Sequence, residues 1–396
     1  MSTAAPAPIA PASPAAASAR SGPGRIASID ALRGLVMLLM LVDHAREFFF
    51  IHAQVSDPMD LTTTDPALFF TRLAAHLCAP VFVALTGLSA WLYASKKGGA
   101  AAASGFLFRR GLFLVALELT LVSFAWTFDL TPPTVFLQVI WAIGLSMIAL
   151  AALVHLPRPA LIAVGLTIVL GHNLLDPVAF APGHPAHPIW AVLHDRGYID
   201  LPWGSQARTS YPLLPWIGVA ALGYALGPWF IVEAAVRRRR LVLLGLLMLG
   251  LFAVLRAINL YGEPVPWAVQ SGLLGTVMSV LNLTKYPPSA DFLLLTLGVG
   301  TLLLAGFEKV WPRLVSGLAV FGGAPLFFYL IHLYALHLAC RACLAAFGAN
   351  QGEGFGVPHI GWVWAIAVLA AVPAWFACRR FAALKRRSSQ WWMKYL

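Results

Sequence analysis

Long apolar runs alternate with short polar segments along most of the chain. A helix needs about 20 apolar residues to cross a hydrocarbon core of roughly 30 Å, and many of the runs are that long. They lack the strict alternation of apolar and polar positions that a membrane β-barrel requires. The pattern predicts an all-α fold, a polytopic membrane bundle of about ten transmembrane helices near residues 30–51, 73–95, 106–128, 134–154, 159–175, 212–232, 241–260, 290–307, 315–345 and 361–380.

Composition excludes a soluble domain. Hydrophobic residues make up 60% of the 396 residues and charged residues 11%, and the mean hydropathy is +0.78. A soluble protein carries charge at about 25% of its positions. We therefore expect the lipid bilayer to be the principal partner of this chain.

The cations indicate how the helices are oriented. If the N-terminus is cytoplasmic, most Lys and Arg fall on the cytoplasmic side, and the other side receives only Arg46, Arg72, Arg196, Arg208, Arg256, Lys285 and Arg341. Cytoplasmic loops carry such an excess, so we expect both termini inside and a location in the bacterial inner (plasma) membrane. The net charge of +11 arises from residues that flank spans, so no nucleic-acid partner is expected.

The pattern divides the chain into a membrane domain with two tails. Residues 1–24 are rich in Ala, Pro and Ser and predict a disordered cytoplasmic tail, residues 25–380 the transmembrane domain, and residues 381–396 a basic cytoplasmic tail. Two outer segments, 176–211 and 261–289, are long enough for structure of their own and could cover a site. The second contains an apolar stretch at 272–281 that predicts a re-entrant or interfacial helix.

Charged groups enter the first span, where an ionisable side chain costs about 2.5–3.5 kcal/mol at the bilayer centre. On a helix, Asp30, Arg33 and His44 fall within an arc of about 60°, and His44 lies roughly 21 Å beyond Asp30. This stripe suggests a functional path through the membrane. The alternative is a structural ion pair between Asp30 and Arg33 at the helix end.

Three histidines are expected at one depth near the outer side: His44, His76 in the second span and His332 in the ninth. Imidazole can act as a base or a nucleophile. Each ring could instead satisfy a neighbouring helix through a hydrogen bond. No H-x-x-x-H or H-E-x-x-H spacing is present, so no metal is expected.

Three motifs carry a resemblance to a known family: R-x-x-S-x-D-x-x-R-G from Arg25, R-x-x-x-H-x-C-A-P-x-F-x-x-L-x-G from Arg72, and G-x-P-L-F-F-Y-x-x-H, which ends at His332. With these motifs the chain resembles bacterial membrane proteins of the DUF1624 family, within the heparan-α-glucosaminide N-acetyltransferase catalytic-domain superfamily. The resemblance extends from about residue 25 to residue 380.

The resemblance implies an enzyme that moves an acyl group, acetyl in the first instance, from cytoplasmic acyl-CoA to a sugar or glycan on the far side, through a histidine near the outer mouth. The chain departs from the eukaryotic pattern, in which the active histidine precedes Trp-Asn-Gly. The aligned position falls near Asp65 or Pro66, and no Trp-Asn-Gly follows. Either His44 or His76 would then take that role.

The expected site combines three groups of residues. Asp43 would orient an imidazole, and the guanidinium groups would bind the CoA phosphates. The expected catalytic residues are His44, His76, Asp43 and His332. The expected CoA-binding residues are Asp30, Arg33, Arg109 and Arg110. Arg72 and Glu47 are the expected acceptor-binding residues.

A different class of function remains open at this stage. The polar stripe of the first span could line the path of a transporter or flippase for a sugar or glycolipid. Small residues such as Gly298-x-Gly300 and Gly322-Gly323 allow close helix contacts and therefore a homo-oligomer.

Overall fold

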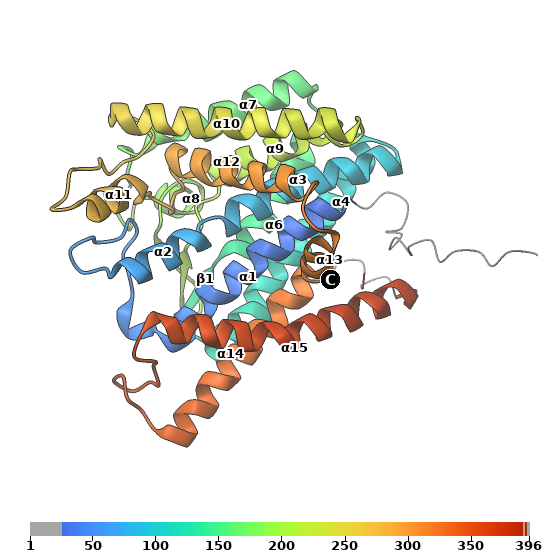
Figure 1. Cartoon of the computed structure of the whole chain (residues 1–396). Coiled ribbons are helices and arrows are strands. Elements are labelled where there is room, and N and C mark those ends of the chain that lie inside the picture. The colour runs from blue at the N-terminus through green and yellow to red at the C-terminus, as the bar shows by residue number, and fades with distance from the viewer. Residues whose placement is uncertain (1–25, 391–392, 394–396) are drawn as a thin grey trace, which may run out of the picture.

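The structure, a computed structural model, describes residues 26–390 and 393, and the predicted tail 1–24 lies outside this range. The chain is mostly helical (Figure 1). The helices are α1 Ala27–Phe49, α2 Pro66–Ala75, α3 Cys78–Lys97, α4 Ala100–Leu117, α5 Ser123–Thr127, α6 Val139–Leu153, α7 Arg158–Gly171, α8 His187–Leu193, α9 Leu214–Ala225, α10 Ala234–Ile258, α11 Leu273–Leu281, α12 Ala290–Gly306, α13 Pro312–Gly322, α14 Pro325–Phe347 and α15 Ile360–Arg387.

Five helical segments within the described residues are long and apolar enough to cross a membrane: Pro66–Lys97, Arg158–Leu175, Ala234–Ile258, Pro325–Phe347 and Ile360–Arg387. These segments indicate a multi-pass membrane protein. Helices α6, α9 and α12 are apolar but shorter. The predicted total of ten spans is therefore not established. The first predicted span, α1, stands apart because it carries charged residues near both of its ends.

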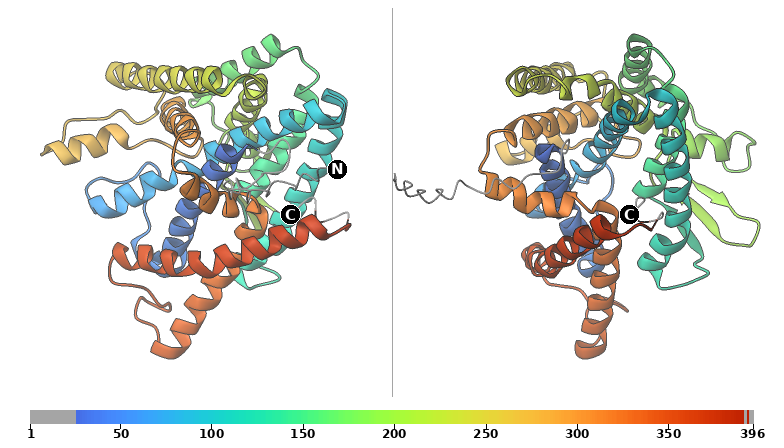
Figure 2. Two further views of the ribbon diagram at one scale, coloured as in Figure 1. Left: turned by 45° about the vertical axis from the view of Figure 1, so that its right-hand side comes forward. Right: turned by 90° about the vertical axis from the view of Figure 1, so that its right-hand side faces the viewer.

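The expectation of an all-α fold is wrong in one region. Strands β1 Thr134–Leu137, β2 Tyr198–Asp200 and β3 Gln206–Thr209 form a sheet in the order β1-β3-β2. β1 runs parallel to β3, and β2 is antiparallel to it. The right-hand view of Figure 2 shows β2 and β3 at the edge of the helical bundle. The span predicted at 134–154 thus begins with a strand, and α6 starts only at Val139.

The span predicted at 315–345 is also wrong as a continuous helix. It breaks between α13 and α14, where Ala324 leaves the helical conformation and Pro325 starts the next helix. Proline has no N–H to donate to the preceding turn, which favours a break of the helix at this position. The helix predicted at 272–281 does form, as α11.

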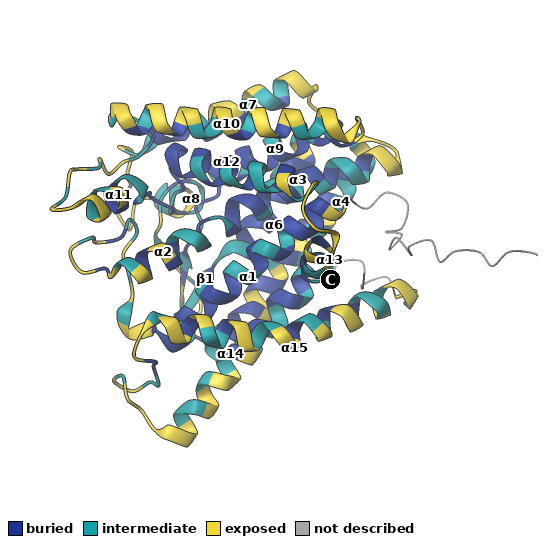
Figure 3. Ribbon diagram, in the orientation of Figure 1, coloured by how far each residue is buried: buried dark blue, intermediate teal, exposed yellow. Residues whose placement is uncertain are grey.

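Helix α1 lies inside the bundle, with α7 and α10 to one side of it and α15 to the other (Figure 3). Its close packing against α13 depends on two glycines. A Cβ atom at Gly34 would lie 2.0 Å from the carbonyl oxygen of Leu318, and one at Gly322 would lie 1.9 Å from that of Asp30. Gly322, considered above as an oligomer contact, is thus used within the chain.

Candidate active site

Two of the three expected histidines meet inside the bundle. Nδ1 of His44 on α1 lies 2.7 Å from Nε2 of His332 on α14, and both residues are buried. The two ring planes are within 12° of each other, with centroids 5.0 Å apart. The approach is therefore edge to edge, with a hydrogen bond between the rings.

The hydrogen bonds of this pair define where its protons lie. Nδ1 of His332 is 2.7 Å from the carbonyl oxygen of Phe328, which can only accept, so this nitrogen carries a proton. In a neutral ring Nε2 of His332 then accepts, and Nδ1 of His44 donates. Nε2 of His44 keeps its lone pair, and none of the hydrogen bonds described for His44 involves this atom. This atom can act as a base or as a nucleophile.

Aromatic residues surround the His44 ring. Trp126 and Tyr329 each meet it edge to face, with centroid distances of 5.1 and 5.8 Å. Trp126 lies on α5, directly after a π-helical segment at Glu118–Val122, and such segments are frequent at functional sites. Glu118 in this segment accepts a hydrogen bond from the backbone N–H of Trp141 at the start of α6.

The carboxylate next to His44 in the sequence is hydrogen-bonded to two arginines, and the hydrogen bonds described for it do not include one to that imidazole. Asp43 accepts hydrogen bonds from Nη1 of Arg72, with both carboxylate oxygens within 3.1 Å, and from Nε of Arg46 at 3.2 Å. Arg46 also pairs with Glu47, which in turn accepts from Gln54. The expected acceptor-binding residues, Arg72 and Glu47, therefore belong to a compensated network of charges. The ring of His44 is oriented by His332 instead.

His76, the third expected histidine, makes no contact with the other two. Its ring packs against Phe292 with centroids 5.2 Å apart, and its Nδ1 has no hydrogen-bond partner. Helical spacing suggested one pocket for the three histidines, but spacing cannot predict which way a ring faces across three helices.

A cavity of about 350 Å³ extends along α1 from Arg33 to Met40. Its lining includes the cations Arg33, Arg110 and Lys385, and most of its other lining residues are apolar or aromatic. Arg33 is held by Asp30 at 3.0 Å, by Ser89 at 3.1 Å and by the carbonyl oxygen of Gly322 at 3.2 Å. The cavity therefore combines three cationic groups with a mostly apolar lining.

Two expectations about the cavity need adjusting. Arg109 does not line it; its side chain is exposed and donates to the carbonyl oxygen of Gly105. Lys385, expected in a basic tail, does line it because α15 continues to Arg387. A sequence signal for this existed, since no glycine or proline interrupts residues 374–387 and basic residues favour the last turn of a helix.

Tyr329 connects the cavity with the histidine pair. It lines the cavity, and its ring also meets both imidazoles, at 5.8 Å from His44 and 5.7 Å from His332. Neither imidazole lines the cavity itself.

Comparison with known proteins identifies the family. No curated protein matches the chain. Residues 25–255, more than half of the chain, match the family described as heparan-alpha-glucosaminide N-acetyltransferase, catalytic. The match includes α1 to α9 and most of α10, and with them His44, Arg33 and Arg110, but it ends before the third motif and His332. The chain therefore belongs to the heparan-alpha-glucosaminide N-acetyltransferase catalytic-domain family.

Proposed function

We propose that the protein is a membrane acetyltransferase, which accepts an acyl group from cytoplasmic acyl-CoA, acetyl-CoA in the first instance, and passes it to an amine or hydroxyl group of a sugar on the opposite side. The hydrogen-bonded pair of His44 and His332 behind a cationic cavity carries this proposal. Family membership supports the reaction class.

The cavity suits the donor. Guanidinium groups bind phosphates through paired, charge-assisted hydrogen bonds, so Arg33, Arg110 and Lys385 would hold the phosphates of CoA at the mouth. The pantetheine arm would lie along α1 from Arg33 to Met40, a rise of about 10 Å. Met40 is one helical turn before His44, so the thioester would end beside the histidine pair.

Acyl transfer would use Nε2 of His44. As a nucleophile, this nitrogen attacks the thioester carbonyl carbon, the C–S bond breaks and the CoA thiolate leaves. The acceptor amine then attacks the acyl group, the bond between the acyl carbon and Nε2 breaks, and the proton that the amine loses balances the charge of the released CoA thiolate. As a base, the same nitrogen removes that proton from the amine during direct attack on the thioester. Either use makes the ring of His44 more positive. Nε2 of His332 can then take up the proton from Nδ1 of His44.

Tyr329 would move during this cycle, because it lines the cavity and its ring contacts both imidazoles, which do not line the cavity themselves. Closure by a side chain excludes water, which would otherwise hydrolyse the acyl group.

The outer segment 176–211 would contribute to acceptor recognition. With β1 and the segment 119–133 it encloses a second cavity of about 830 Å³. Asp129, Thr131 and Ser205 supply hydrogen-bonding groups, and Trp203 supplies an aromatic face. A mixture of apolar surface and a few polar groups is typical of small-molecule sites.

The test uses the purified full-length protein in detergent with radiolabelled acetyl-CoA and a panel of amino sugars. We expect acetyl transfer and CoA release by the wild type and a loss of about 10²- to 10⁴-fold in His44→Ala, because general acid–base groups contribute that much. His332→Ala should also be impaired. His359→Ala, an exposed histidine at the start of α15, is the control.

Two results would contradict the proposal: no CoA release with any amino sugar or glycan extract, or an unchanged rate in His44→Ala. Uptake of a sugar into proteoliposomes without consumption of acetyl-CoA would instead favour transport.

A further inference from the structure

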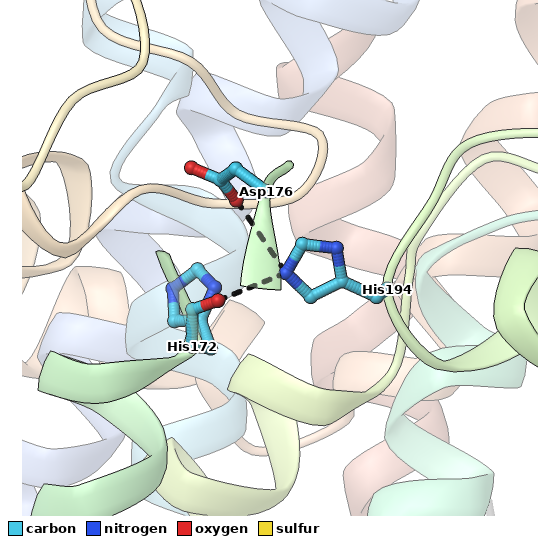
Figure 4. Close-up of side chains that lie close together, drawn as sticks. All are labelled: His172, Asp176 and His194. Carbon is cyan, nitrogen blue, oxygen red and sulfur yellow. Dashed lines mark hydrogen bonds and ion pairs between the residues drawn. The ribbon is translucent and has the colours of Figure 1, made fainter. Parts of the chain in front are cut away.

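A second cluster of titratable side chains lies outside the candidate active site. It comprises His172 at the end of the α7 segment, Asp176 four residues later, and His194 directly after α8. One nitrogen or carboxylate oxygen from each lies within 4.8 Å of the other two. Figure 4 shows the three side chains converging, with two ion-pair or hydrogen-bond contacts made by His194.

The atoms that contact the ring of His194 favour a positive charge at this position. Its Nε2 lies 3.4 Å from Oδ1 of Asp176 and 3.1 Å from the carbonyl oxygen of His172, and its Nδ1 lies 3.3 Å from Oδ1 of Asp195. Every one of these partners is an acceptor. A neutral imidazole carries only one proton, so one of its nitrogens would face oxygen atoms with its lone pair. A second proton or a bound cation removes this conflict.

The state of His172 favours the cation. Its side chain is 2% exposed, and neither ring nitrogen makes a hydrogen bond that meets ordinary geometry, although the Pro288 backbone lies nearby. A buried imidazole without partners is unfavourable. A second proton on His194 would leave the ring of His172 without a partner. A metal ion would instead bind one nitrogen of the His172 ring.

We propose that His172, Asp176 and His194 bind a divalent transition-metal ion of the zinc type. Two imidazoles and a carboxylate are common ligands for such ions, with a water in the fourth position. The metal would take the Nε2 lone pair of His194, and Nδ1–H would donate to Asp195, the usual arrangement of a metal-bound histidine with a carboxylate behind it.

Neighbouring contacts already hold the carboxylate ligand. Nδ2 of Asn173 donates to Oδ2 of Asp176 at 2.9 Å, which leaves Oδ1 directed at His194. Oδ1 of Asn173 in turn accepts from the backbone N–H of Ala290 at the start of α12. The ion would therefore join the outer segment 176–211 to the ends of α7 and α12. Sequence motifs indicated no metal because the third ligand lies 18 residues beyond the second.

The experiment measures zinc binding to the untagged full-length protein in detergent, stripped with a chelator and dialysed. We expect about one zinc per chain by elemental analysis and a melting temperature that zinc raises and chelator lowers. Asp176→Asn retains the shape of the side chain and should weaken binding at least tenfold, as should His172→Gln. His359→Ala, on the same predicted side but outside the cluster, should bind zinc like the wild type.

The proposal is overturned if the wild type binds no zinc at micromolar concentrations, or if both ligand variants retain wild-type affinity. If one ligand variant fails to fold, the zinc affinity of the other variant still tests the proposal. Cobalt substitution gives an independent readout, because a ligated Co²⁺ ion absorbs in the visible and the signal should be lost in both variants.

Discussion

At the scale of single residues, neighbouring positions in the sequence contact different parts of the structure. Asp43 and His44 follow each other on α1, yet the carboxylate pairs with Arg72 while the imidazole pairs with His332. Consecutive helical residues point about 100° apart, so one faces α2 and the other α14. The same rotation separates Arg110, which lines the cavity, from Arg109, which is exposed.

This difference gives a matched pair of variants for the donor site. Arg110→Ala removes a cation from the cavity, and a hydrogen bond to a charged group contributes about 1.5–3 kcal/mol. We expect the Michaelis constant for acetyl-CoA to rise about tenfold or more. Arg109→Ala makes the same chemical change outside the cavity and should leave this constant unchanged. Equal effects in steady-state kinetics would argue against Arg110 as a phosphate ligand.

At the scale of helices, glycines decide how closely α1 approaches its neighbours. Gly34 and Gly322 allow α1 to pack closely against α13, because neither residue places a side chain in that contact. Gly87 has the same role in the contact of α3 with α9, where a Cβ atom would lie 2.0 Å from the carbonyl oxygen of Ala220. Close approach of backbones is the usual way in which membrane helices pack. The break at Pro325 then lets α14 leave in a new direction and bring His332 to α1.

Gly322→Ala should therefore damage the site through the backbone. The added methyl group would overlap the carbonyl oxygen of Asp30, and overpacking of this kind costs about 1–3 kcal/mol. We expect a lower melting temperature in detergent and a loss of acetyl transfer. Gly317→Ala on the same helix meets nothing within 4 Å and should behave like the wild type. An undiminished melting temperature in Gly322→Ala would contradict the packing described here.

At the scale of the whole molecule, the candidate active site requires two accessible sides. The cations that line the cavity include Arg110 and Lys385, which the charge pattern places on the cytoplasmic side. The same charge pattern predicts that the segment 176–211, with β2, β3 and two of the three proposed metal ligands, lies on the opposite side. Donor and acceptor would thus approach the histidine pair from different compartments.

Two exposed tryptophans test this orientation. Trp203 in the outer segment is 69% exposed, and Trp311 between α12 and α13 is 82% exposed. We expect a membrane-impermeant thiol reagent to label Trp203→Cys in intact cells and to label Trp311→Cys only after the membrane is opened. The wild type provides the background from the four native cysteines. The reverse pattern would invert the topology and place the cationic cavity on the wrong side for CoA.

The membrane class, most helix positions and the charged first helix could be predicted from the sequence alone, because hydropathy and helical periodicity are local properties. The tertiary structure decided that His44 pairs with His332 and not with His76 or Asp43, that Lys385 joins the cavity, and that His194 meets His172 and Asp176. These contacts join residues far apart in the chain. They depend on where helices bend and how closely their backbones approach, and no local pattern encodes either.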